Sequence, residues 1–181
     1  MKKIIIAALL SVLIAAPALA DDTGRFYVAG DLGTASYSNM SPFPNPGVFR
    51  IAGGYHFSPM LAAELGYSIF GDSTVSDPSG SIKLSASSFQ IAAVGSLPLN
   101  EQFDLIGKIG LASNSEKYTG SGAYAGGASY SESDLLIGLG AQFHVNSRVS
   151  VRLLYDNYGK FDNYPDPMKA TSISLGVAYN F

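Results

Sequence analysis

The chain has 181 residues, of which 47% are hydrophobic, 14% are charged and none is cysteine. The lack of cysteine excludes a disulfide framework, a thiolate nucleophile and a cysteine-ligated metal site. With 11 basic and 14 acidic residues the net charge is −3, so the chain lacks a basic footprint and we predict no nucleic-acid partner.

Residues 1–20 have the pattern of a secretory signal peptide. Two lysines precede an apolar run that ends at Ala16, and small residues occupy the first and third positions before the predicted cleavage point. An uncleaved membrane anchor is the alternative, but the run is short and no stop-transfer pattern follows it. We predict cleavage after Ala20, which leaves one domain over residues 21–181 with a net charge of 9 − 14 = −5.

The mature domain contains eight stretches in which large apolar residues alternate with small or polar ones. A period of two is typical of β-strands with one apolar face. No later segment approaches about eighteen consecutive apolar residues, so no helical membrane span is predicted. The predicted strands cover residues 25–36, 48–57, 61–70, 86–97, 103–114, 133–145, 149–161 and 171–181.

The last strand shows the alternation most clearly. Ile173, Leu175, Val177, Tyr179 and Phe181 lie on one predicted face, and small or polar residues lie on the other. A soluble sheet buries its bulky face in a core, whereas a membrane barrel exposes that face to lipid and fills its interior with small and polar groups. The pattern alone does not distinguish the two arrangements.

The connections and the inward face favour the membrane. A soluble barrel of lipocalin type, with an apolar ligand cavity, is the alternative. However, the face rich in Gly, Ala and Ser also carries the strand charges, and its side chains are too small to fill a core. In addition, aromatic residues cluster at the strand ends, as they do at membrane interfaces. We therefore predict an all-β, eight-stranded, antiparallel, up-and-down transmembrane barrel with short periplasmic turns and long external loops. The predicted long loops cover residues 37–47, 71–84, 115–132 and 162–169.

Several segments resemble the OmpA-like transmembrane domain family, which includes opacity and attachment-invasion proteins. They are Phe26–Gly33, Ala52–Phe57, Ala63–Tyr67, Val151–Asp156 and Leu175–Phe181. The resemblance implies a small barrel of the porin family in the outer membrane of a Gram-negative bacterium. Longer members carry a peptidoglycan-binding domain after the barrel. Because the chain stops at the terminal strand, we expect no such domain and no cell-wall tethering.

Six charged residues are predicted to point into the barrel. Counting from the periplasmic turns places them in two sets, Glu64, Lys108 and Arg152 at one depth and Asp31, Arg50 and Asp156 nearer the outside. The family resemblance implies a lumenal ion-pair network that includes the first set. Pairing offsets the cost of burying such charges, and an eight-stranded barrel has an interior that side chains nearly fill. A plugged lumen is therefore favoured over the alternative, a narrow pore for ions or very small solutes gated by these charges.

The sequence offers little support for enzymatic chemistry, and we predict that the protein is not an enzyme. His56 and His144 lie near the periplasmic ends of strands, whereas lipid A substrates lie in the outer leaflet, and Asp104 could simply pair with a histidine. The glycine-rich segment 120–127 follows no buried parallel strand and opens no helix, so it is interpreted as a loop tip rather than a phosphate cradle. No metal-ligand cluster and no cofactor are predicted.

Tyrosines in the predicted external loops are candidates for surface contacts. Tyr124 and Tyr130 lie among Ser and Gly in the longest loop, and Tyr164 lies in the last. Aromatic residues amid small flexible ones suit adaptable protein contacts, although anchoring at the membrane interface is an equally good interpretation of Tyr124 and Tyr130. The predicted partners are outer-membrane lipids, lipopolysaccharide, and host or environmental surface ligands that meet the four external loops. The predicted function is structural and adhesive.

Overall fold

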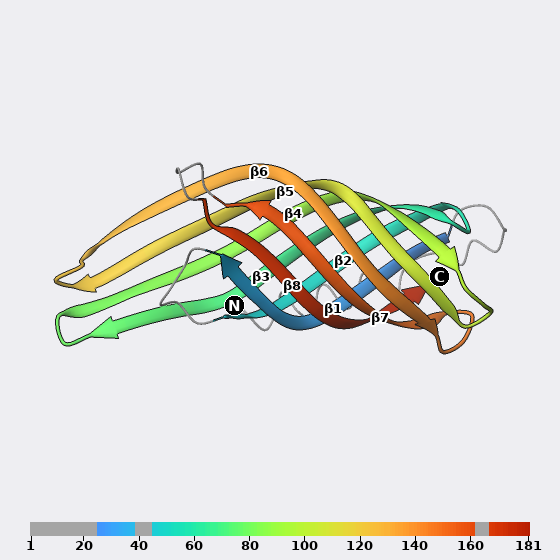
Figure 1. The fold of residues 1–181 in the computed structure, drawn as a ribbon, viewed down its shortest axis with the longest axis horizontal. Coiled ribbons are helices and arrows are strands. Elements are labelled where there is room, and N and C mark those ends of the chain that lie inside the picture. Colours follow the sequence, from blue (N-terminus) through green and yellow to red (C-terminus); the bar gives the residue numbers. More distant parts are fainter. Residues whose placement is uncertain (1–24, 39–44, 162–166) are drawn as a thin grey trace.

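The computed structural model describes residues 25–38, 45–161 and 167–181. Within them the chain forms eight strands, each antiparallel to the next, and the first strand pairs with the last to close a barrel (Figure 1). No helix in this part of the chain is long and apolar enough to cross a membrane. The strands are β1 (Arg25–Ser38), β2 (Gly47–Ser58), β3 (Leu61–Asp77), β4 (Gly80–Pro98), β5 (Phe103–Gly122), β6 (Gly126–His144), β7 (Val149–Lys160) and β8 (Lys169–Asn180). The predicted fold class is confirmed.

The large apolar residues lie on the outside of this barrel. On β8 the side chain of Leu175 is 59% exposed, whereas its neighbour Ser174 is 3% exposed. The same order recurs on β5, where Ile109 and Leu111 are exposed and Lys108 is buried. A soluble fold buries its large apolar side chains, whereas a barrel surrounded by lipid exposes them, as this one does. It rules out the lipocalin-type alternative.

Aromatic side chains pack in pairs around the rim where Arg25, Phe181 and the short turns lie. The ring centroids of Phe26 and Tyr55 are 4.9 Å apart, and those of Phe103 and Phe143 are also 4.9 Å apart. Paired rings at one end of an apolar wall form the girdle that marks a membrane–water interface. Because the short turns of outer-membrane barrels lie on the periplasmic side, this rim is the periplasmic one.

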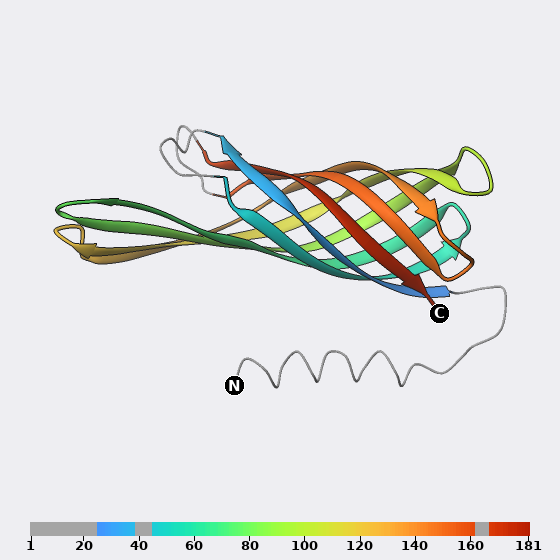
Figure 2. The same ribbon diagram turned by 90° about the horizontal axis from the view of Figure 1, so that it is seen from below.

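Four strands, β3 to β6, continue beyond the other end of the barrel (Figure 2). The predicted long loops 71–84 and 115–132 are wrong, because these residues form the outer halves of two hairpins. Their ladder is regular, with Thr74 opposite Lys83 and Lys117 opposite Ser129. We call this four-stranded sheet the strand extension. It comprises residues 73–77 of β3, 80–87 of β4, 113–122 of β5 and 126–133 of β6.

Pairing with adjacent strands explains why these residues form strands. Ser and Gly have little strand preference of their own, but each strand here is held by a ladder that is continuous with the barrel wall. A bulge between Phe70 and Ser73 on β3 adds one residue and marks where the extension leaves the barrel. Among the described residues, β3 pairs beyond this point only with β4, and the outer half of β6 pairs only with β5, so the extension has two free edges.

Candidate functional site

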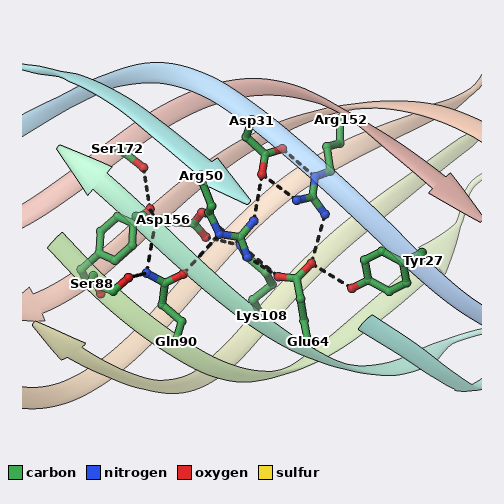
Figure 3. A network of polar contacts seen from close by, with 12 residues as sticks. Tyr27, Asp31, Arg50, Glu64, Ser88, Gln90, Lys108, Arg152, Asp156 and Ser172 are labelled. Atoms are coloured by element: carbon green, nitrogen blue, oxygen red, sulfur yellow. Dashed lines mark hydrogen bonds and ion pairs between the residues drawn. The ribbon is translucent and has the colours of Figure 1, made fainter. Parts of the chain in front are cut away.

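Two arginines and two carboxylates meet in the middle of the lumen (Figure 3). Arg50 on β2 donates from Nη1 to Oδ2 of Asp31 on β1 at 3.0 Å and contacts Glu64 on β3 through Nη2. Arg152 on β7 donates from Nε and Nη2 to the two oxygens of Asp31 at 2.7 and 2.6 Å. It also donates from Nη1 to Oε2 of Glu64 at 3.1 Å. Each carboxylate therefore binds both arginines, and these charge-assisted bonds join four strands across the barrel.

The lysine belongs to the same assembly. Lys108 Nζ lies 2.8 Å from Oδ1 of Asp156 and 3.9 Å from Oε1 of Glu64, so Glu64 links the lysine pair to the arginines. The six residues predicted as a lumenal ion network thus come together, and contacts join the two sets into which the sequence divided them. Asp31 lies directly opposite Arg50 in the β1–β2 register, and the long side chain of Arg50 then reaches Glu64. All six charges form one lumenal ion network.

The network is electrically balanced and buried. It contains three cations and three anions, and none of the six residues is more than 4% exposed. Removing an ion from water costs several kcal/mol, which is offset only where partners and further hydrogen bonds surround it. Neutral groups supply some of these bonds, because Tyr27 donates to Glu64 at 2.8 Å and Arg50 donates to Oε1 of Gln90 at 3.4 Å. Tyr27 and Gln90 were not among the predicted network residues because they are uncharged, although the alternation pattern places both side chains in the lumen.

Inward-facing glycines make room for the network. A methyl group on Gly176 would collide with the Asp31 carboxylate and the backbone carbonyl of Gly30. One on Gly138 would collide with the Asp156 carboxylate and lie 2.8 Å from Cε of Lys108. These inward glycines are therefore required for the charged side chains to fit into the lumen.

An apolar layer covers the network on each side. On the outer side, the ring centroid of Phe70 is 5.3 Å from that of Tyr158 and 5.6 Å from that of Phe161, and all three residues are buried. Tyr158 also shares hydrogen bonds with Ser68 and Ser172. On the periplasmic side, a second buried cluster covers the network. It contains Tyr27, Ala29, Ala62, Val94, Ile106, Leu154 and Ala178. The network therefore lies between two buried apolar layers.

The periplasmic mouth is a separate hollow of about 910 Å³. At its wall His144 Nε2 lies 2.9 Å from Oδ2 of Asp104, the pairing considered from the sequence, and His144 Nδ1 lies 3.0 Å from Oγ of Ser150. Although a serine, a histidine and an aspartate are thus connected, Ser150 is 0% exposed and its hydroxyl cannot meet a substrate. His56 packs against the ring of Tyr27 instead. Among the described residues, no three His, Asp or Glu side chains are placed to hold a metal ion.

Of the three tyrosines predicted to lie in external loops, one lies in a turn and one lies in a strand. Tyr124 lies in the turn between β5 and β6, and its hydroxyl donates to Oδ2 of Asp77 at 2.7 Å. This hydrogen bond lowers the pKa of Asp77 and raises that of Tyr124. Tyr130 is not in a loop, because it belongs to β6 and packs against Tyr118. Tyr164 lies outside the described residues.

Comparison with known proteins places this barrel in a family. The outer membrane protein beta-barrel domain model matches residues 5–181. The chain belongs to that family. It is therefore an outer-membrane β-barrel, which agrees with its lipid-facing wall. No curated protein sequence matches the chain significantly.

Solved structures with the same fold include three small barrels from bacteria. The attachment invasion locus protein Ail of Yersinia pestis, in complex with the heparin analogue sucrose octasulfate, has 18% identity and a TM-score of 0.64, with 88% of this chain and 99% of that chain covered. Neisserial surface protein A has 20% identity and a TM-score of 0.65, with 86% and 97% covered. The N-terminal barrel of Pseudomonas aeruginosa OprF has 14% identity and a TM-score of 0.61, with 88% and 100% covered. At these identities the similarity is one of fold.

Proposed function

We propose that this barrel is a structural and surface-interaction protein of the outer membrane, whose lumen is plugged and whose external parts contact host or environmental ligands. One observation carries the proposal: four of the eight strands continue outward as an ordered sheet that the membrane span does not require. A transmembrane strand needs only about 9–11 residues, whereas β4, β5 and β6 have 19, 20 and 19. The surplus length serves a purpose outside the bilayer.

The packing of the lumen supports a plug over a pore. An ion path would require the bonds of Arg152 to Asp31 and Glu64 to break, and the ring of Phe70 to leave its neighbours. A charge that lost its partners in this way would remain buried, where an unpaired ion is strongly disfavoured. The pore alternative therefore has no observation in its favour.

The remaining proposals concern export and lipid. The N-terminal pattern supports removal of residues 1–20 during export, so N-terminal sequencing of the membrane-extracted protein should begin at Asp21. The exposed apolar wall supports contact with outer-membrane lipids, including lipopolysaccharide in the outer leaflet. Ail, which shares the fold, was crystallised with a sulfated sugar, which makes sucrose octasulfate a reasonable first probe of the extension.

The test is to shorten the extension while leaving the barrel intact. Ser73 lies opposite Leu84 and Glu116 lies opposite Tyr130, so each hairpin can be closed at these pairs with Asn-Gly, a favoured two-residue turn. The shortened protein is produced in bacteria that lack the natural one. Adhesion to epithelial cells, to polystyrene and to immobilised sucrose octasulfate is then compared with that of the full-length protein.

The control variant replaces only the tip residues Pro78 and Ser79 with Asn-Gly, which keeps the length of the extension. We expect the full-length and control proteins to raise adhesion to at least one surface and the shortened protein to lose that gain. Equal adhesion by the shortened protein, at equal surface amounts of folded barrel, would contradict the proposal, as would the lack of any gain from the full-length protein.

A further inference from the structure

The outward face of the sheet changes from apolar to polar side chains at the point where the strand extension leaves the barrel. Below this point the face is built of large apolar residues, and above it almost every position is Ser, Thr or Lys. The last apolar residue and the first hydroxyl-bearing residue are Phe89 and Ser87 on β4, Leu111 and Ser113 on β5, and Leu135 and Ser133 on β6. Three neighbouring strands thus make the same change, which places the edge of the hydrocarbon layer.

The hydroxyl groups form rows across the sheet. Ser87, Ser115 and Ser131 lie opposite one another on β4, β5 and β6, and Oγ of Ser115 lies 3.0 Å from Oγ of Ser131. The next row outward consists of Ser85, Lys117 and Ser129. These two rows border a shallow hollow of about 280 Å³. Serine is not among the residues that strands favour, so strand propensity does not account for the rows.

The charges on this face are mainly positive. Lys83 and Lys117 are both exposed on it, and Lys117 borders the hollow. The carboxylate of Asp72 lies 2.6 Å from Lys83 and accepts a hydrogen bond from Ser85. The carboxylates of Glu116 and Glu132 belong to the alternate positions of β5 and β6 and so point to the opposite face of the sheet. The outward face therefore offers hydroxyl groups and ammonium groups together, immediately beyond the apolar wall.

The position of this face beside the outer leaflet indicates which molecules it contacts. Because it continues the lipid-facing wall, the first groups that it meets sideways are the headgroups of the outer leaflet. In an outer membrane these headgroups are those of lipopolysaccharide, which carry phosphate groups and sugar hydroxyls. Lysine ammonium groups pair with phosphate, and serine hydroxyls both donate to and accept from sugar hydroxyls. A protein partner fits less well, because the face lacks the aromatic residues that anchor protein interfaces.

We propose that the outward face of the strand extension binds the phosphorylated sugar headgroup of lipopolysaccharide, at the hollow bordered by Ser85, Ser87, Ser115, Lys117, Ser129 and Ser131. This inference rests on the proposed function only in that the protein resides in the outer membrane. The bound headgroup would brace the extension laterally and leave its tip and its other face for surface ligands.

The test uses the full mature chain in phosphatidylcholine nanodiscs. Rough lipopolysaccharide, the same lipopolysaccharide after removal of its phosphates, and phosphatidylglycerol are titrated separately, and backbone amide shifts report both affinity and location. The variants are Lys83→Gln with Lys117→Gln, and Ser115→Val, which keeps a strand-forming residue. The matched control is Lys169→Gln, an exposed lysine on β8 at the other side of the outer rim.

We expect rough lipopolysaccharide to shift the amides of Ser115, Lys117 and Ser131. The double lysine variant should bind about thirtyfold more weakly, since each of its two lysines contributes about 1 kcal/mol toward an anionic surface. The control should bind as the wild type does, and loss of the phosphates should weaken binding. Wild-type affinity in both variants, shifts confined to other strands, or equal affinity for phosphatidylglycerol would overturn the proposal. None of these outcomes depends on adhesion, so failure here is distinct from failure of the proposed function.

Discussion

At the scale of single residues, Glu64 is the centre of the lumen. Its carboxylate accepts hydrogen bonds from Tyr27, Arg50 and Arg152 and lies 3.9 Å from the ammonium group of Lys108. No other residue in the described network contacts all three cations. The balance of charge therefore depends on this side chain more than on any other.

Glu64→Ala should destabilise the barrel by about 3–5 kcal/mol, because it leaves one buried positive charge without a partner. Urea unfolding of the refolded protein in detergent or lipid vesicles measures the change. Glu101→Ala is the control, since Glu101 is an exposed residue of a periplasmic turn and its loss should have little effect. Equal stability of both variants would show that the network does not hold the barrel together.

Gly176→Ala should destabilise the barrel by about 1–3 kcal/mol, because the added methyl group would collide with the Asp31 carboxylate and the carbonyl of Gly30. Gly30→Ala is the matched control, since a methyl group there meets no atom within 4 Å. The two unfolding midpoints are compared in the same lipid. A smaller effect at Gly176 than at Gly30 would be incompatible with a tightly packed lumen.

At the scale of elements, each strand has one face for lipid and one for the lumen, and only the outer halves of β3 to β6 depart from this rule. Their outward face is polar because it lies beyond the bilayer, as the change between Leu111 and Ser113 shows. The turns between these strands are held by side chains as well as by the ladder. Asp77, for example, accepts hydrogen bonds from the amides of Ser79 and Gly80 and from Tyr124.

Leu175→Arg should cost about 2–4 kcal/mol of stability in a membrane, the amount expected for a charge near the bilayer midplane. Leu175 is 59% exposed in the middle of the apolar wall of β8. Thr171→Arg, on the same face but beyond the apolar wall, should cost little. Unfolding from lipid vesicles measures both variants, and a negligible cost at Leu175 would place that face away from lipid.

The contacts of Asp77 predict a pH-dependent turn. Hydrogen bonds from Tyr124 and from the amides of Ser79 and Gly80 hold the pKa of Asp77 below its usual value of 3.8. These bonds therefore contribute fully above pH 3.8, and their contribution is lost as the pH falls through the lowered pKa of the folded state. Amide protection of Ser79 and Gly80 should decrease in that acidic range. Asp77→Asn should abolish this pH dependence, and an identical acid response in the variant would refute the assignment.

Much of the barrel could be predicted from the sequence, because alternation assigns each residue to a face. Leu175 and Glu64 are assigned correctly in this way. The strand extension could not be predicted, because residues 115–132 have the composition of a loop and are held as strands by their neighbours. The pairing of Asp31 with Arg152 was also beyond reach, since 121 positions separate them and side-chain length decides which groups meet.

At the scale of the whole molecule, a packed barrel carries a sheet that extends beyond it on one side. The three layers of the lumen join strands that are distant in sequence, and the apolar wall holds the barrel in lipid. A rigid wall of this kind suits a sheet that projects from one side of the rim (Figure 2). Nothing in this arrangement requires a passage through the centre.

The central claim is that the lumen is closed, and single-channel conductance of the refolded mature chain in a planar lipid bilayer tests it most directly. The wild type is expected to give no discrete openings, because the balanced network of Asp31, Arg50, Glu64, Lys108, Arg152 and Asp156 lies buried between two apolar layers. Discrete wild-type openings whose size or frequency changes in Glu64→Ala would contradict the account and make the lumen the functional site.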